Sequence, residues 1–193
     1  MASKKPKSIL YRRKREKRTN YSKRLNLLLS RKSRLVVRVS NQHIIAQITD
    51  FTAKGDKVLV AYDSHNLKKL GWNYSKKNLP AAYLSGYALA KKAIAANVSE
   101  AILDTGLTSP LPKTKLYAFL KGALDGGLQI PHGSDAIYPN EERIQGKHIQ
   151  SYAEYLKEKS QELYQKRFSK YLKENTQPEK IMEKFSKTKE QIK

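Results

Sequence analysis

The chain contains no cysteine among its 193 residues. This absence excludes disulfide bonds, thiol nucleophiles and zinc sites built on cysteine. The sequence also has no run of about 18 apolar residues, so it predicts no segment that spans a bilayer. Residues 1–18 lack the apolar stretch of a secretory signal, and together these absences favour a cytosolic protein.

Acidic residues are scarce, because 17 Asp and Glu stand against 39 Lys and Arg, giving a formal net charge of +22. Residues 1–38 alone hold 15 Lys and Arg and a single acid, Glu16. A protein with that charge attracts polyanions, of which nucleic acid and an anionic membrane surface are the two candidates. Apolar residues make up only 39% of the chain, so part of it lies outside any packed core.

The most basic stretch is YRRKREKR, residues 11–18. Such a segment has little apolar surface to bury, so we predict that residues 1–20 form a basic RNA-binding extension that is disordered until a polyanion neutralises it. The guanidinium group of arginine suits bidentate contact with phosphate and stacking on bases. The predicted RNA contacts in this stretch are Arg12, Arg13, Lys14, Arg15, Lys17 and Arg18.

A short helix is predicted after the basic stretch, capped by Asn20. Its apolar face, which includes Leu25 and Leu29, is expected to pack on the body and leave a cationic edge outward. Tyr21, like Tyr11 before it, either stacks on an exposed base or serves as a core or staple residue. Further predicted RNA contacts on this helix and its exit are Tyr21, Lys23, Arg24, Arg31, Lys32 and Arg34.

Two more candidate RNA contacts have an alternative explanation each. Arg38 interrupts an apolar strand, so it either faces RNA, which we favour, or is paired inside the protein. Trp72 lies between Lys68-Lys69 and Lys76-Lys77, a pattern that fits base stacking between phosphate contacts. A tryptophan that anchors the loop to the body explains the same pattern.

Residues 21–138 are predicted to form an α/β body. Runs rich in β-branched residues predict strands at residues 35–39, 43–48, 57–62 and 100–104. Helical patterns occupy residues 81–97 and 113–125. Because the strands are apolar at most successive positions, we expect helices on both faces of a mixed sheet. Residues 139–193 are predicted to form a helical, lysine-rich C-terminal region.

Several blocks of the sequence resemble one ribosomal family in its archaeal form. Besides residues 12–21, they are LVVRVSN (35–41), HIIAQ (43–47), NLPAAYLSG (78–86), LDTGL (103–107), LKGALDGGLQIPH (120–132) and RIQGKHI (143–149). The family is the 5S-rRNA-binding protein of the large ribosomal subunit, number eighteen in the bacterial count and number five in the eukaryotic count. The resemblance covers residues 11–153, and Lys17 stands where the family usually has glycine.

The resemblance implies a three-layer α/β fold of ribonuclease-H-like topology and a place in the central protuberance. It implies three partners: 5S rRNA, large-subunit rRNA and the neighbouring ribosomal protein that binds 5S rRNA. Neither DNA nor a membrane is an expected partner. The predicted function is thus a structural constituent of the large subunit that anchors 5S rRNA. The alternatives are a non-ribosomal basic RNA-binding protein and a peripheral membrane-surface protein.

Catalysis, a cofactor and a metal site are not predicted. Asp50, Asp104 and Asp125 are available for a nuclease-like metal site, but the first strand offers Arg38 where such a site needs an acid. The four histidines are dispersed, and no GxxxxGK[ST] phosphate loop is present.

Overall fold

A computed structural model describes residues 9–192, and its centre is a mixed four-stranded sheet in the order β3-β2-β1-β4. β1 (Arg34–Val39) pairs antiparallel with β2 (Ile44–Thr52) and parallel with β4 (Ile102–Asp104). β2 pairs antiparallel with β3 (Gly55–Asp63). The predicted α/β class and mixed sheet are confirmed.

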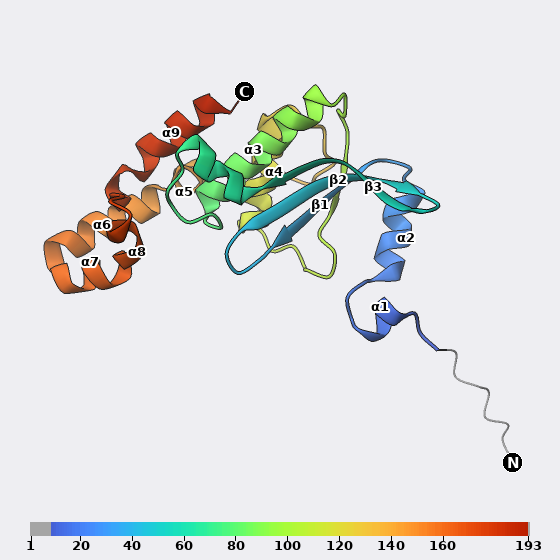
Figure 1. Ribbon diagram of the computed structural model, residues 1–193, viewed down its shortest axis with the longest axis horizontal. Coiled ribbons are helices and arrows are strands. Elements are labelled where there is room, and N and C mark those ends of the chain that lie inside the picture. The colour runs from blue at the N-terminus through green and yellow to red at the C-terminus, as the bar shows by residue number, and fades with distance from the viewer. Residues whose placement is uncertain (1–8, 193) are drawn as a thin grey trace, which may run out of the picture.

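One helix, α3 (Leu79–Ala95), is buried on most of its surface between the sheet and other helices. Its N-terminus is capped by the Asn78 side chain, which accepts a hydrogen bond from the Ala81 backbone N–H. It contacts β2 and β3 and lies along α4 (Lys115–Asp125) (Figure 1).

The backbones of α3 and α4 touch where Gly86 and Gly122 face the opposite helix. A Cβ on Gly86 would overlap the backbone of Phe119, and one on Gly122 would overlap the backbone of Tyr83. Only glycine permits this close approach, so these two positions fix the crossing of the helices.

The two faces of the sheet differ. Leu35, Val37 and Ile48 point into the core, whereas the pairing register places Arg38 beside Ile45 on the other face, where both are exposed. That second face is open around Arg38 and Ile45, but it is closed at the end where Arg34 and Thr49 are buried. Helix coverage of both faces is therefore only partly confirmed in residues 9–192, and the three-layer arrangement stays a prediction. Within the apolar runs, residues that point away from the core, such as Gln47, alternate with core residues. The high apolar content of these runs hid this alternation. The ribonuclease-H-like topology stays a prediction.

The C-terminal region is helical and folds back on the body. Its last helix, α9 (Ile181–Gln191), places Ile181 and Phe185 in the main core. Ala153, Leu156, Tyr164 and Phe168 form a second, smaller apolar cluster. The elements before α9 are η2 (Asp135–Ile137), α5 (Glu141–Gln145), α6 (Lys147–Lys159), α7 (Gln161–Arg167), α8 (Ser169–Lys173) and η3 (Pro178–Lys180). The division of the chain at residues 20 and 138 stays a prediction.

The two helices before the sheet, α1 (Arg12–Arg15) and α2 (Tyr21–Leu29), project from one end of the molecule. Figure 1 shows α6, α7 and α8 at the opposite end of its long axis, with the sheet and α3 between. Two regions far apart in sequence thus form the two extremities of the molecule.

Candidate nucleic-acid interface

Residues 9–20, called the arm below, contain one helical turn where the sequence predicts disorder. Glu16 lies between two cations, with carboxylate oxygens 3.9 Å from Arg12 Nε and 3.5 Å from Arg18 Nε. The rings of Tyr11 and Tyr21 lie 5.3 Å apart and join the arm to α2, which is the staple role considered for these tyrosines. The one acid and the ring contact explain why this short basic segment has local structure.

The predicted RNA contacts of the arm are all exposed. They are Arg12, Arg13, Lys14, Arg15, Lys17 and Arg18. Arg13 Nε donates a hydrogen bond to Thr19 Oγ1 at 2.9 Å, which orients its guanidinium group. Surface ion pairs such as those of Glu16 contribute little free energy, so a phosphate can displace them at small cost.

The orientation predicted for α2 is wrong, although Asn20 caps the helix as predicted, accepting from the Lys23 backbone N–H. Leu25 and Leu29 are 57% and 69% exposed, and the cationic side of the helix faces the body. Arg24 Nη2 donates to both carboxylate oxygens of Asp56, at 2.9 and 3.0 Å.

Lys23 Nζ completes this attachment by donating to Thr105 Oγ1 at 2.7 Å and to the Gly106 carbonyl oxygen at 3.3 Å. Hydrophobic periodicity could not reveal these polar partners, because they come from β3 and from the end of β4. Lys23 and Arg24 therefore hold α2 on the body. Because their side-chain donors already bind protein acceptors, they are less able to bind RNA phosphates.

Arg34 is a core residue, and its predicted RNA contact is withdrawn. The residue is only 2% exposed. Its Nη2 lies 2.7 Å from Asp56 Oδ2, and its Nη1 donates to Asp104 Oδ2 at 3.0 Å. Burial raises the pKa of Asp56, but hydrogen bonds and charge from Arg34 and Arg24 outweigh it and hold that pKa below its usual value.

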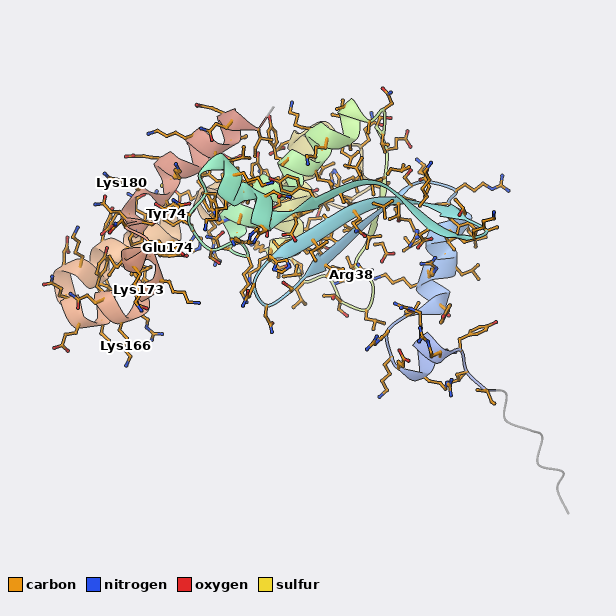
Figure 2. The ribbon with its side chains drawn as sticks, viewed as in Figure 1. Arg38, Tyr74, Lys166, Lys173, Glu174 and Lys180 are labelled. Atoms are coloured by element: carbon orange, nitrogen blue, oxygen red, sulfur yellow. The ribbon has the colours of Figure 1, made fainter. Side chains whose placement is uncertain are left out.

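Arg38 combines the two explanations that the sequence left open. Its Nη1 donates to the carbonyl oxygens of Val37 and Asp104, at 2.8 and 2.7 Å, and its Nη2 lies 3.3 Å from Asp104 Oδ1. The side chain is still 47% exposed on the open face of the sheet (Figure 2). Arg38 is thus fixed in orientation and remains accessible to an anion.

Trp72 anchors its loop, and the base-stacking role predicted for it is withdrawn. Its residue exposure is 0%, and its Nε1 donates to the Ser75 carbonyl oxygen at 3.2 Å. The loop begins at Gly71, whose φ of 74° favours glycine and ends η1 (Ser64–Leu70). A fully buried indole offers no face to a base.

Arg31 and Lys32 lie at the exit of α2 and are exposed, as expected for RNA contacts. Lys32 Nζ is 2.7 Å from Glu100 Oε2 in a pair whose members are about half exposed. Such a pair is weak enough to open for a phosphate.

The arm, α2 and the sheet enclose a cavity of about 490 Å³. Its charged lining residues are Arg13, Arg18, Lys23, Arg24, Arg38, Asp56 and Asp104. Both carboxylates are held by Arg24, Arg34 and Arg38, so neither repels an incoming anion at full strength. Sequence reasoning missed Asp56 as part of this site, since its spacing from Arg34 and Arg24 shows no local pattern.

Residues 9–192 do not meet the structural requirements of a metal centre or of a membrane-spanning helix. No group of three or more histidine or acidic side chains in this part of the chain is placed to hold a metal ion. None of its helices has both the length and the apolar character needed to cross a membrane.

Comparison with known proteins identifies the family. A family model described as "Ribosomal large subunit proteins 60S L5, and 50S L18" matches residues 7–100. The chain is 46% identical over 181 residues to the large ribosomal subunit protein uL18 of Thermofilum pendens, covering 94% of this chain and 92% of that protein. It is 47% identical over 184 residues to the uL18 of Korarchaeum cryptofilum, covering 95% and 93%. The chain therefore belongs to the L5 and L18 family of the large ribosomal subunit, whose members are structural proteins of the cytoplasmic ribosome and not enzymes.

Proposed function

We propose that this protein binds 5S rRNA through the arm and the adjoining open face of the sheet, and anchors it to large-subunit rRNA in the central protuberance. The observation that carries the proposal is the row of exposed cations on the arm beside the cation-lined cavity. The neighbouring ribosomal protein that binds 5S rRNA is the proposed protein partner.

The contact set differs from the one that the sequence suggests. Arm cations reach phosphates, Arg31 and Lys32 extend the surface beyond α2, and Arg38 supplies a fixed guanidinium group on the sheet. Arg34 and Trp72 contribute only through stability, because both are buried. Most of the binding energy then comes from counterion release when cations neutralise phosphates.

The test compares the full-length protein with the Arg13→Gln/Arg18→Gln double variant in binding to purified 5S rRNA across a salt series. Each phosphate contact contributes about 0.7–0.9 to the slope of log affinity against log salt. We expect the variant to bind more weakly and to lose about 1.4–1.8 from that slope.

The matched control is Lys180→Gln/Lys187→Gln, which removes the same charge from exposed residues outside the cavity. We expect this control to keep most of the wild-type slope. Equal slopes and affinities for the wild type and the arm variant would reject the arm as an RNA contact. Binding of the wild type to anionic vesicles as strongly as to 5S rRNA would favour the membrane alternative.

A further inference from the structure

A groove of about 1060 Å³ lies at the end of the molecule opposite to the arm. One wall is the loop that follows η1, residues 72–77, and the other is formed by α6, the end of α7 and α8. Figure 2 shows Tyr74 and Glu174 in this region, where the body meets the C-terminal helices.

Contacts between the walls hold the groove in shape. Tyr74 Oη donates to the Gln177 carbonyl oxygen at 2.6 Å, and the Ser75 backbone N–H donates to Tyr171 Oη at 3.2 Å. The rings of Tyr74 and Tyr171 also meet edge to face, 5.5 Å apart. The groove is therefore preformed, which lowers the entropy lost when a ligand binds.

Cations line both walls of the groove. Lys68, Lys76 and Lys77 come from η1 and the loop, and Arg167 and Lys170 come from the helical wall. The one carboxylate in the lining is Glu174. Within residues 9–192, Lys68, Lys77, Arg167 and Lys170 have no carboxylate within 4.0 Å, so their charge is not neutralised by this part of the protein.

Aromatic rings also line the groove. The Tyr152 residue is 46% exposed, and its ring lies 6.2 Å from that of Phe168, which in turn stacks on Tyr171 at 6.1 Å. The half-exposed Tyr152 ring offers an apolar surface to a ligand in the groove. Rings of this kind bind bases by stacking in proteins that hold single-stranded nucleic acid.

We infer that this groove is a second RNA site, which holds an unpaired RNA segment with a base on Tyr152 and phosphates on the flanking cations. The inference rests on the proposed RNA-binding function and adds a contact at the far end of the molecule. Lys166 and Lys173, on the adjoining α7 and α8, extend the cationic surface beyond the groove (Figure 2).

Charge and composition favour RNA over a protein partner. The cores of protein–protein interfaces are depleted in lysine, whereas this groove carries lysine or arginine on each wall. A phosphate backbone repeats its charge along its length and so can meet cations on both walls of the groove. An acidic peptide would match the charge of the groove, but it has no base to stack on the exposed Tyr152 ring.

The first test measures binding of full-length Arg167→Gln/Lys170→Gln and of Tyr152→Ala to large-subunit rRNA in a salt series. We expect the charge variant to lose about 1.4 from the salt slope, at about 0.7 for each single-strand contact. We expect Tyr152→Ala to weaken binding roughly 5- to 150-fold, with the slope unchanged. Arg167 and Lys170 are exposed, so thermal unfolding of the charge variant should match the wild type, whereas Tyr152→Ala removes a half-buried ring and should lower the unfolding temperature slightly.

The second test locates the contact in large subunits that contain the wild-type protein. We expect ultraviolet irradiation to attach a nucleotide to a peptide containing Tyr152 or residues 168–171, which mass spectrometry identifies. Nucleotide adducts confined to the arm would overturn the groove as an RNA site. Chemical crosslinks from Lys170 to another protein, without any nucleotide adduct there, would overturn it in favour of a protein partner.

The variants also separate this inference from the proposed function. If Arg13→Gln/Arg18→Gln loses affinity for 5S rRNA but the groove variants keep their affinity for large-subunit rRNA, the groove alone is rejected. If the groove variants lose affinity for large-subunit rRNA but the arm variant keeps its affinity for 5S rRNA, the groove is supported and the arm is rejected. If every variant binds its RNA as tightly as the control Lys180→Gln/Lys187→Gln does, both are rejected.

Discussion

Replacing Arg34 with methionine tests whether the most buried cation of residues 9–192 serves stability or RNA binding. Arg34 bridges Asp56 and Asp104 at 2.7 and 3.0 Å, and it is almost completely buried. Removing one partner of a buried ion pair costs about 3–5 kcal/mol. Each carboxylate keeps a second arginine, Arg24 for Asp56 and Arg38 for Asp104, so we expect about 3 kcal/mol.

Urea unfolding followed by circular dichroism measures this loss. With a slope of about 2 kcal/mol/M, the midpoint of Arg34→Met should fall by about 1.5 M. Under conditions where the variant is folded, the salt dependence of 5S rRNA binding should stay close to the wild-type value, because a buried guanidinium group releases no counterion from the RNA.

Arg15→Met is the matched control, since Arg15 is exposed on α1. Its unfolding free energy should change by less than about 0.5 kcal/mol, while its salt slope should fall by about 0.7–0.9. An Arg34→Met protein as stable as the wild type, with weaker RNA binding and a reduced salt slope, would refute the structural role assigned to Arg34.

Two further predictions concern the packing and the ion pairs of the body. Gly122→Ala should destabilise the fold by about 3 kcal/mol, because the added Cβ overlaps the backbone of Tyr83; Gly133→Ala, whose added Cβ meets nothing within 4 Å, should leave the urea midpoint unchanged or slightly higher. The lowered pKa of Asp56 stabilises the fold at pH values above its unfolded pKa, and this contribution disappears as pH falls through the folded pKa. The stability difference between the wild type and Asp56→Asn should therefore shrink below about pH 4, and a constant difference in acid unfolding would contradict it.

The strands and main helices were predictable because local patterns determine them. The β-branched runs located β1, β2 and β3, and the helical pattern of residues 81–97 located α3. Coverage of the second sheet face was not predictable from the same runs. It depends on where the helices pack, and both α3 and α4 rely on a close approach at glycines that periodicity does not indicate.

The exposed cations of the arm were also predictable, since a dense run of charge without apolar residues stays at the surface. The roles of Lys23, Arg24 and Arg34 were not, because their partners lie on β3 and at the end of β4. The local sequence around a cation that pairs with a distant carboxylate looks the same as that around a cation that is free to bind a phosphate. Trp72 shows the same ambiguity, since lysines on both sides accompany a ring that is buried.

The separation of the arm from the groove bears on how an RNA anchor works. A rigid body that holds two RNA-binding surfaces makes the second contact intramolecular once the first has formed, provided that the RNA spans both. The α3–α4 contact and the return of α9 into the core fix the distance between the ends. An assembled complex of 5S rRNA and large-subunit rRNA that reaches both ends should then bind far more tightly than either RNA alone. Equal affinity for the complex and for the better-binding single RNA would show that only one end binds.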